Sequence, residues 1–271
     1  MVFKEKLKEV RGNYQYRLNT ILNFIVDVDS YLDKYFEQSD KPDMHSDPDT
    51  IEEGIKLRDF LNEVLDPNHE IENGKGIKIK SDALSEVLMT FIKSVQYREF
   101  LNEMTLSYLI SCQEAILKDY LYVVLKNNPD NLKTGKEKIS YDEVLKFHNM
   151  DELIEFIIKK MVDSIGYGSV EDVFNFYKDR FNIDFKDFDR WEVIVESSLR
   201  RNLIIHNKGI VNDQYCRRFK NYNLNEQIEI DGKYIKSIAE NLIEFNQFCF
   251  SAISKKFRLD DKNIVFKDSE S

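Results

Sequence analysis

The chain has 271 residues, of which 42% are hydrophobic and 13% aromatic, and its formal net charge is −10. This hydrophobic content supports a packed core and excludes a wholly disordered chain, while the negative charge argues against a general nucleic-acid coat protein, which would be basic. No stretch approaches the roughly 18 consecutive apolar residues of a membrane span, and the amino terminus has no apolar signal core. The three cysteines have no paired spacing, which is typical of a reducing compartment. We therefore expect a soluble, cytoplasmic protein without membrane partners.

The first third of the chain predicts two helices separated by loops. Apolar residues repeat every seven positions from Phe3 to Glu37, which predicts one long helix. Residues 39–50 are rich in Pro, Asp and Ser and predict a loop. A second helix is expected from about Ile51 to Leu65, followed by a linker over Asp66–Ser81. We therefore expect an N-terminal helical region over residues 1–80.

The remainder of the chain predicts further helices. Glycine and proline are scarce, and no proline follows Pro129, which favours helix throughout. Ser140 and Glu143 have the spacing of a helix-capping box. Residues 227–236 alternate around Asp231-Gly232, which predicts a short β-hairpin before the last helix. The expected helices cover residues 82–95 and 98–126 (separate or continuous), 151–165, 170–181, a segment with one apolar face at Phe188, Trp191, Val195, Leu199 and Leu203, and 234–257. We expect one helical domain over residues 81–258 and a flexible tail over 259–271.

The most informative segment is RRNLIIHNKG, from Arg200 to Gly209. Arginine is permanently charged and binds phosphate oxygens through parallel hydrogen bonds. Histidine is the side chain that ordinarily exchanges protons near neutral pH. Gly209 suits the left-handed position that ends many helices, so His206 is expected in the last turn. Together these residues indicate phosphodiester chemistry.

The spacing within this helix assigns different roles to the two arginines. At about 100° per residue, Arg201 and His206 lie roughly 140° apart around a regular helix and do not share a face. Both could reach one phosphate if the helix loosens before His206, or if a second subunit completes the site. Arg200 lies four residues after Glu196, the favourable order for an ion pair. We therefore assign Arg200 mainly to that pair and Arg201 to the site.

A basic segment coincides with these residues. Residues 200–220 contain six cationic side chains against Asp213 alone, a local sum of +5. RNA could approach this segment and be repelled by the acidic remainder of the chain. The alternative is a solvated basic surface without a functional role. The six cations are Arg200, Arg201, Lys208, Arg217, Arg218 and Lys220.

The sequence indicates no second active site. His45 and His69 lie in acidic loops and His148 ends a helix, and none has a cysteine or second histidine at metal-ligand spacing. Neither a phosphate-binding glycine loop nor a serine-nucleophile turn is present. We expect no metal and no other cofactor. A purely structural alternative for His206 is a helix-end residue whose charge is favoured by the helix dipole.

Residues 196–215, ESSLRRNLIIHNKGIVNDQY, resemble the signature helix of HEPN domains, in which an Arg, four to six residues and then a His mark the catalytic members. Arg201, Asn202 and His206 match this pattern. Residues 105–125, TLSYLISCQEAILKDYLYVVL, resemble the first HEPN helix, and the resemblance covers about residues 97–258. It implies an all-α fold, a helical bundle of HEPN type, to which this chain adds the N-terminal helical region and the short β-hairpin.

The resemblance also implies a metal-independent endoribonuclease. An RNA 2′-hydroxyl would attack the adjacent phosphate, leaving a 2′,3′-cyclic phosphate and a 5′-hydroxyl. His206 would act as general acid or base, Arg201 would stabilise the phosphate, and Asn202 would orient one of these groups. The residues expected to bind substrate or support the site are Glu196, Arg200, Asn207, Lys208, Arg217 and Arg218.

The expected partners follow from the same resemblance. It implies a homodimer with the motif helices near the two-fold axis, and a toxin or antiphage defence effector that acts on RNA. Such an effector would be controlled by an inhibitor (an antitoxin) or by an activating sensor protein. The principal rival is a non-catalytic HEPN-like helical module that binds RNA, nucleotide or a protein partner. A third alternative is a nuclease that cuts only after a partner assembles it.

Overall fold

The computed structural model describes residues 2–39, 81–133, 139–166 and 169–259. In these ranges the chain is mostly helical and contains no strand, which confirms the all-α class. The second helix predicted over residues 51–65, the linker after it and the tail from residue 260 lie outside the described residues. The helices are α1 (Val2–Ser39), α3 (Ser81–Asn127), α4 (Tyr141–Val144), α5 (Met150–Gly166), α6 (Val170–Phe181), α7 (Trp191–Asn207), α8 (Asp213–Arg218) and α9 (Gly232–Lys256), with short 3-10 turns η1 (Pro129–Leu132) and η2 (Phe185–Asp187).

Most of the described helices match the predicted segments. The heptad pattern from Phe3 to Glu37 corresponds to α1, and the two helices predicted over residues 82–126 form the single helix α3. The predicted capping box is present: the Glu143 N–H donates to Ser140 Oγ (3.2 Å) and the Ser140 N–H donates to Glu143 Oε2 (3.1 Å). The helix that it starts, α4, is only one turn long.

The chain divides into two compact units. The larger unit contains the described residues of Met1–Leu22, Thr105–Glu229 and Lys233–Ser271, and the smaller unit contains those of Asn23–Met104 and Ile230–Gly232. The first half of α1 therefore packs within the larger unit. The domain boundary predicted between residues 80 and 81 stays a prediction, because residues 40–80 lie outside the described part.

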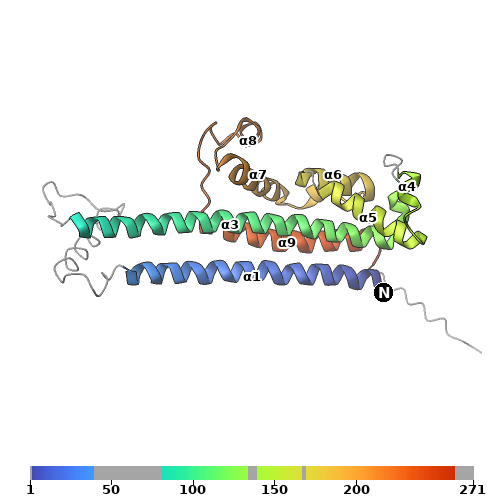
Figure 1. The fold of residues 1–271 in the computed structure, drawn as a ribbon, viewed down its shortest axis with the longest axis horizontal. Coiled ribbons are helices and arrows are strands. Elements are labelled where there is room, and N and C mark those ends of the chain that lie inside the picture. The colour runs from blue at the N-terminus through green and yellow to red at the C-terminus, as the bar shows by residue number, and fades with distance from the viewer. Residues whose placement is uncertain (1, 40–80, 134–138, 167–168, 260–271) are drawn as a thin grey trace, which may run out of the picture. The chain divides into compact units, whose positions relative to one another are not determined.

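Three helices run side by side in the larger unit, α1, α3 and α9 (Figure 1). The Tyr14 hydroxyl of α1 donates to Asp119 of α3 (2.9 Å). Between α3 and α9, the buried Tyr120 hydroxyl donates to Asn246 (2.7 Å), whose amide in turn donates to the Arg11 carbonyl (3.3 Å). These bonds satisfy polar groups that would otherwise be costly to bury, and they fix the helices against one another.

Apolar contacts fill the space around these three helices. Along α9 the residues that face the core are all buried, at Ile235, Ile238, Leu242, Phe245, Cys249 and Ile253. An aromatic cluster then attaches η2 and α6 to α9. The Phe185 ring lies 4.9 Å from the Tyr177 ring and 5.6 Å from the Phe245 ring, centroid to centroid. Since each buried aromatic side chain contributes on the order of 1.5–3 kcal/mol, this cluster anchors the chain immediately before α7.

The predicted hairpin over residues 227–236 was wrong. Gly232 is the first residue of α9, and the extended residues before it pair with a different segment. Ile210 and Gln227 form an isolated antiparallel bridge, supported by bonds from the Val211 N–H to the Glu226 carbonyl (2.9 Å) and from the Ile228 N–H to the Gly209 carbonyl (2.9 Å). This segment therefore pairs with the residues that follow α7 and does not form a hairpin.

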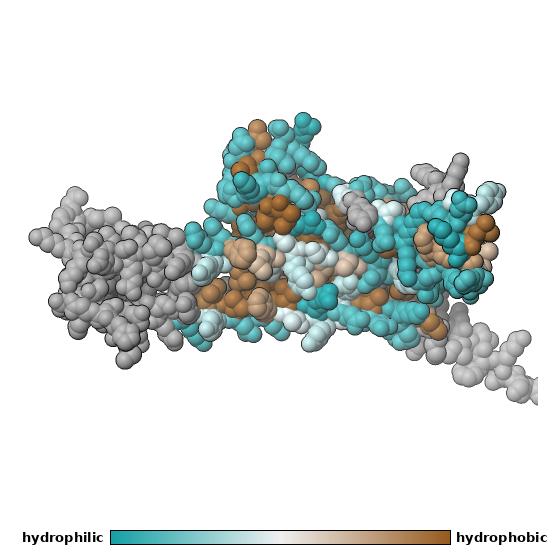
Figure 2. Space-filling view, in the orientation of Figure 1, coloured by the Kyte–Doolittle hydropathy of each residue, from teal (hydrophilic) through white to brown (hydrophobic). Residues whose placement is uncertain are grey.

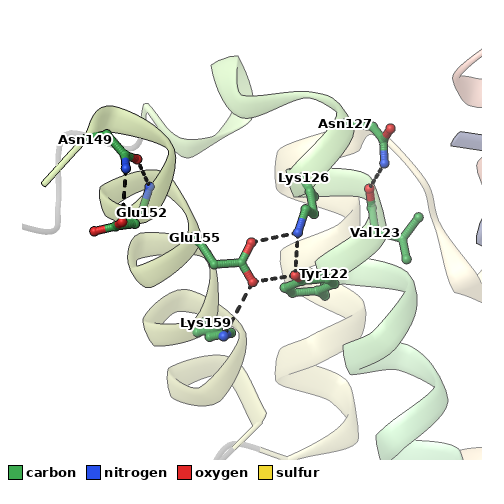
Figure 3. A network of polar contacts seen from close by, with 8 residues as sticks. All are labelled: Tyr122, Val123, Lys126, Asn127, Asn149, Glu152, Glu155 and Lys159. Carbon is green, nitrogen blue, oxygen red and sulfur yellow. Dashed lines mark hydrogen bonds and ion pairs between the residues drawn. The ribbon is translucent and has the colours of Figure 1, made fainter. Parts of the chain in front are cut away.

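An ion-pair network joins α3 to α5 (Figure 3). The Glu155 carboxylate accepts hydrogen bonds from Lys126 Nζ (2.8 Å) and from the Tyr122 hydroxyl (2.5 Å), and Lys159 Nζ lies 3.5 Å away. The bonds from Lys126 and Tyr122 lower the pKa of Glu155 to about 2. The ionised form of Glu155 is therefore favoured in the folded protein.

We expect Glu155→Gln to lower the free energy of unfolding at pH 7 by about 1 kcal/mol, since the network is partly exposed to water. The folded-state pKa of about 2 lies below the ordinary value of roughly 4.3. The stabilisation is thus complete above roughly pH 4.3 and is lost as the pH falls toward 2. Denaturant unfolding at pH 7 and at pH 3 measures this effect, with Asp163→Asn, an exposed acid on the same helix, as the control. An equal loss at both pH values would contradict the expectation.

Candidate functional site

The site is built on the last turn of α7. This helix remains α-helical to Asn207, and the backbone N–H groups of Lys208 and Gly209 both donate to the Leu203 carbonyl. Lys208 (φ 55°) and Gly209 (φ 74°) adopt the left-handed conformation, so the predicted helix end is confirmed. A Cβ atom at Gly209 would lie 2.5 Å from Gln227 Nε2. Glycine is therefore favoured there both by its conformation and by the close approach of this side chain.

A pocket of about 560 Å³ lies against the end of α7. It is lined by all three predicted catalytic residues, Arg201, Asn202 and His206, and by Asn207. Other elements complete its wall: Glu114 of α3, Ser169 and Val170 at the start of α6, and Asn212, Gln214 and Tyr215 around α8. Because the helix is regular and both side chains still line one pocket, neither a loosened helix nor a second subunit is needed to bring Arg201 and His206 to it.

Arg201 is held by an acidic partner from a distant part of the sequence. Its Nη2 donates to Glu114 Oε1, and its Nη1 donates to Asn202 Oδ1 (3.0 Å). The Arg201 side chain is 18% exposed, and its buried Nε has no hydrogen-bond partner among the described residues. The guanidinium is thus fixed at the pocket, and two of its five N–H groups donate within the described residues. Sequence reasoning missed Glu114, because no local pattern distinguishes it from other charged residues of α3, such as Lys118 and Asp119.

His206 presents an exposed imidazole to the same pocket. In the described part of the chain no group forms a hydrogen bond or an ion pair with its ring. It lies in the last turn of α7. Its ring nitrogens are therefore available to exchange a proton with a bound molecule.

Arg200, although adjacent to Arg201, lies in a buried network instead of the pocket. Its Nε donates to Glu196, which confirms the predicted pair. The same guanidinium donates to the Tyr222 hydroxyl and to the Glu229 carbonyl (3.0 Å). It also lies over the ring of Tyr234, with 4.4 Å from its central carbon to the ring centroid. Arg200 therefore supports the fold beneath the site.

The Glu196 carboxylate at the centre of this network is fully engaged. Besides Arg200, it accepts hydrogen bonds from the hydroxyls of Tyr215 (2.5 Å) and Tyr234 (2.8 Å). Burial, together with the neighbouring carboxylate, raises the pKa of both tyrosines. Both hydroxyls therefore stay protonated and continue to donate. Glu196 accordingly stabilises the packing of α7 against α8 and α9.

The basic segment is less positive than its sequence indicates. Arg218 does not line the pocket; its guanidinium donates to Glu171 (2.7 Å) and Glu192 (3.1 Å). With Arg200 and Arg201, three of the six cations are thus paired with acids from outside residues 200–220. Lys208, Arg217 and Lys220 are exposed, do not line the pocket and form no ion pair within the described ranges. The surface of the part that contains α7 and α8 is mostly hydrophilic in Figure 2.

The remaining candidates add no second site. His148 is exposed, as expected, whereas His45 and His69 lie outside the described residues. Where the chain is described, no three His, Cys, Asp or Glu side chains are grouped as they would be around a metal ion, and no helix combines the length and apolar character needed to cross a membrane. Comparisons with models of known protein families, with curated proteins and with solved structures found no match to this chain.

Proposed function

We propose that the pocket at the end of α7 cleaves RNA without a metal cofactor, as an endoribonuclease of HEPN type. One observation carries this proposal: a fixed guanidinium (Arg201), an amide (Asn202) and an exposed imidazole (His206) line one pocket. Phosphodiester transfer needs a group that exchanges a proton and a fixed positive charge that offsets the charge developing on the phosphate. Both lie in this pocket.

The proposed reaction is an internal transesterification. His206 takes the proton of the 2′-hydroxyl, whose oxygen attacks the adjacent phosphorus. The bond from phosphorus to the 5′-oxygen breaks, and that oxygen takes a proton from water, so that the products are a 2′,3′-cyclic phosphate and a 5′-hydroxyl; His206 then returns its proton to the solvent. Arg201 offsets the charge on the phosphate oxygens, and Asn202, which accepts a bond from Arg201 (3.0 Å), holds the guanidinium in place.

Glu114 has a supporting part in this proposal. Its carboxylate holds Arg201 at the pocket and lowers the net positive charge there. A preorganised charge stabilises a transition state better than a mobile one, because no reorganisation is needed during the reaction. Arg201 keeps this contact and uses the remaining N–H groups of its two Nη atoms for the phosphate.

The biological setting that we propose is a toxin or an antiphage defence effector, controlled by an inhibitor or by an activating sensor protein. A homodimer remains part of this proposal, although both residues line one pocket within a single chain. One alternative is a non-catalytic module that binds RNA, nucleotide or a protein partner. The Glu114–Arg201 pair favours this alternative, because it already neutralises the charge of the arginine.

We expect the purified protein to cleave total RNA in the presence of EDTA and to leave cyclic-phosphate ends. DNA should bind but resist cleavage, since it lacks the 2′-hydroxyl nucleophile. Added salt should weaken RNA binding, because counterions are released from the phosphates that the exposed cations contact. His206→Ala in the same buffer is the control. Loss of activity in EDTA that magnesium restores would contradict the metal-independent mechanism, and binding without cleavage would support the non-catalytic module.

A further inference from the structure

Neutral amide side chains gather in the pocket beside the proposed catalytic residues. Asn202 and Asn207 come from the end of α7, whereas Asn212 and Gln214 come from the start of α8. Proton transfer and charge stabilisation are already assigned to His206 and Arg201. Apart from the bond that Asn202 makes with Arg201, the proposed reaction gives these amides no role.

The hydrogen bonds of the three asparagines fix how their amides are turned. Asn202 Oδ1 accepts from Arg201, and Asn212 Oδ1 accepts from the Tyr215 N–H (3.0 Å). Asn207 Nδ2 donates to the Ile210 carbonyl (2.5 Å). A donor must lie against an acceptor, so these bonds determine which end of each asparagine amide is the oxygen and which is the nitrogen.

The other end of each amide forms no hydrogen bond with any described residue and is therefore available to a ligand. Asn202 and Asn212 each keep an NH₂ group, and Asn207 keeps its carbonyl oxygen. Gln214 is exposed, and neither end of its amide is bonded within the described residues. The pocket thus offers donors and acceptors without adding charge.

Apolar side chains form another part of the same wall, namely those of Val170, Leu199 and Leu203. A molecule that suits both kinds of surface has apolar faces and a polar edge that both donates and accepts. Nucleobases have this character, and proteins that bind single-stranded RNA read bases along such edges. The volume of about 560 Å³ lies within the ordinary range for small-molecule sites and exceeds the needs of one base.

We propose that this side of the pocket is a nucleobase subsite, in which Gln214 reads adenine. A glutamine amide forms two parallel hydrogen bonds with adenine, donating to N7 and accepting from the N6 amino group. The inference rests on the proposed function, because the phosphate held by Arg201 and His206 is what brings the attached base within reach of Gln214.

The test measures binding of the four nucleoside 3′-monophosphates to the full chain by titration calorimetry, so that no cleavage is needed. We expect 3′-AMP to bind about 10-fold more tightly than 3′-UMP, within the range of a bidentate amide–adenine pair. Gln214→Ala should remove this preference. Gln214→Glu should also weaken the binding of 3′-AMP, because a carboxylate cannot donate to adenine N7. Gln96→Ala, the same change at an exposed glutamine outside the pocket, is the matched control and should behave as wild type.

The outcomes separate this inference from the proposed function. Equal binding of all four nucleotides, no binding of any at millimolar concentration, or an adenine preference that survives Gln214→Ala would overturn the subsite and leave the cleavage proposal standing. An adenine preference that Gln214→Ala removes, in a protein that cleaves no RNA, would support the subsite and overturn the nuclease.

Discussion

His206→Ala and Arg201→Ala are each expected to lower the rate of RNA cleavage by about 100- to 10,000-fold, the range for losing a general acid–base group or a preorganised charge. The fold should survive both changes. The His206 imidazole is exposed and makes no hydrogen bond within the described residues, so its removal is expected to change the free energy of unfolding by less than about 0.5 kcal/mol. Arg201→Ala removes one partly exposed ion pair, that with Glu114, which contributes about 1 kcal/mol or less to the free energy of unfolding.

The measurement compares cleavage rates and thermal unfolding of the two variants with matched controls. His148→Ala removes an exposed histidine that does not line the pocket, and Arg217→Ala removes an exposed arginine of the basic segment. His148→Ala should leave cleavage unchanged, and Arg217→Ala should at most weaken RNA binding. Arg201→Lys keeps the charge but loses the planar fork that bonds Asn202 and Glu114, so an intermediate rate is expected. A wild-type rate in either alanine variant of the pocket would contradict the assignment.

Local sequence patterns predicted the helices well because the relevant interactions are themselves local. Apolar periodicity predicted α1 and α9, and the capping box at Ser140 joins residues only three positions apart. The turn signal at Asp231-Gly232 failed because two longer-range effects oppose it. The residues before it bond to Gly209 and Val211, and the residues after it enter a helix that buries Ile235 completely.

In the site, too, local interactions were predictable from the sequence and long-range ones were not. The Glu196–Arg200 pair was predictable, since its members lie four residues apart on one helix. The partner of Arg201 was not, because Glu114 precedes it by 87 residues and only the packing of α3 beside α7 brings them together. Charge along the sequence was similarly incomplete, since Arg218 is compensated by Glu171 and Glu192 from other helices. Sequence therefore identified the three proposed catalytic residues that line the pocket, but neither its lining residues from other helices nor which of its charges are compensated.

Arg200→Ala is expected to lower the free energy of unfolding by about 3–5 kcal/mol, the cost of leaving a buried charge without its partner. The reason is the environment of Glu196, whose side chain is only 14% exposed. In the variant its carboxylate would still accept hydrogen bonds from two tyrosine hydroxyls, but it would have lost the cation that Arg200 provides. Urea unfolding measures the loss. Arg200→Lys should recover only part of it, because an ammonium cannot bond Glu196, Tyr222 and the Glu229 carbonyl with the geometry of a planar fork.

A double variant separates the charge from the packing in this prediction. Arg200→Met with Glu196→Gln removes both charges and keeps most of the side-chain volume, so it should be less destabilised than Arg200→Ala alone. Cleavage provides the second readout: where Arg200→Ala is still folded, its rate should remain close to that of wild type, since Arg200 does not line the pocket. A stability loss below about 1 kcal/mol would contradict the buried-charge argument. A loss of cleavage in the folded variant as large as that of Arg201→Ala would show that Arg200 belongs to the site.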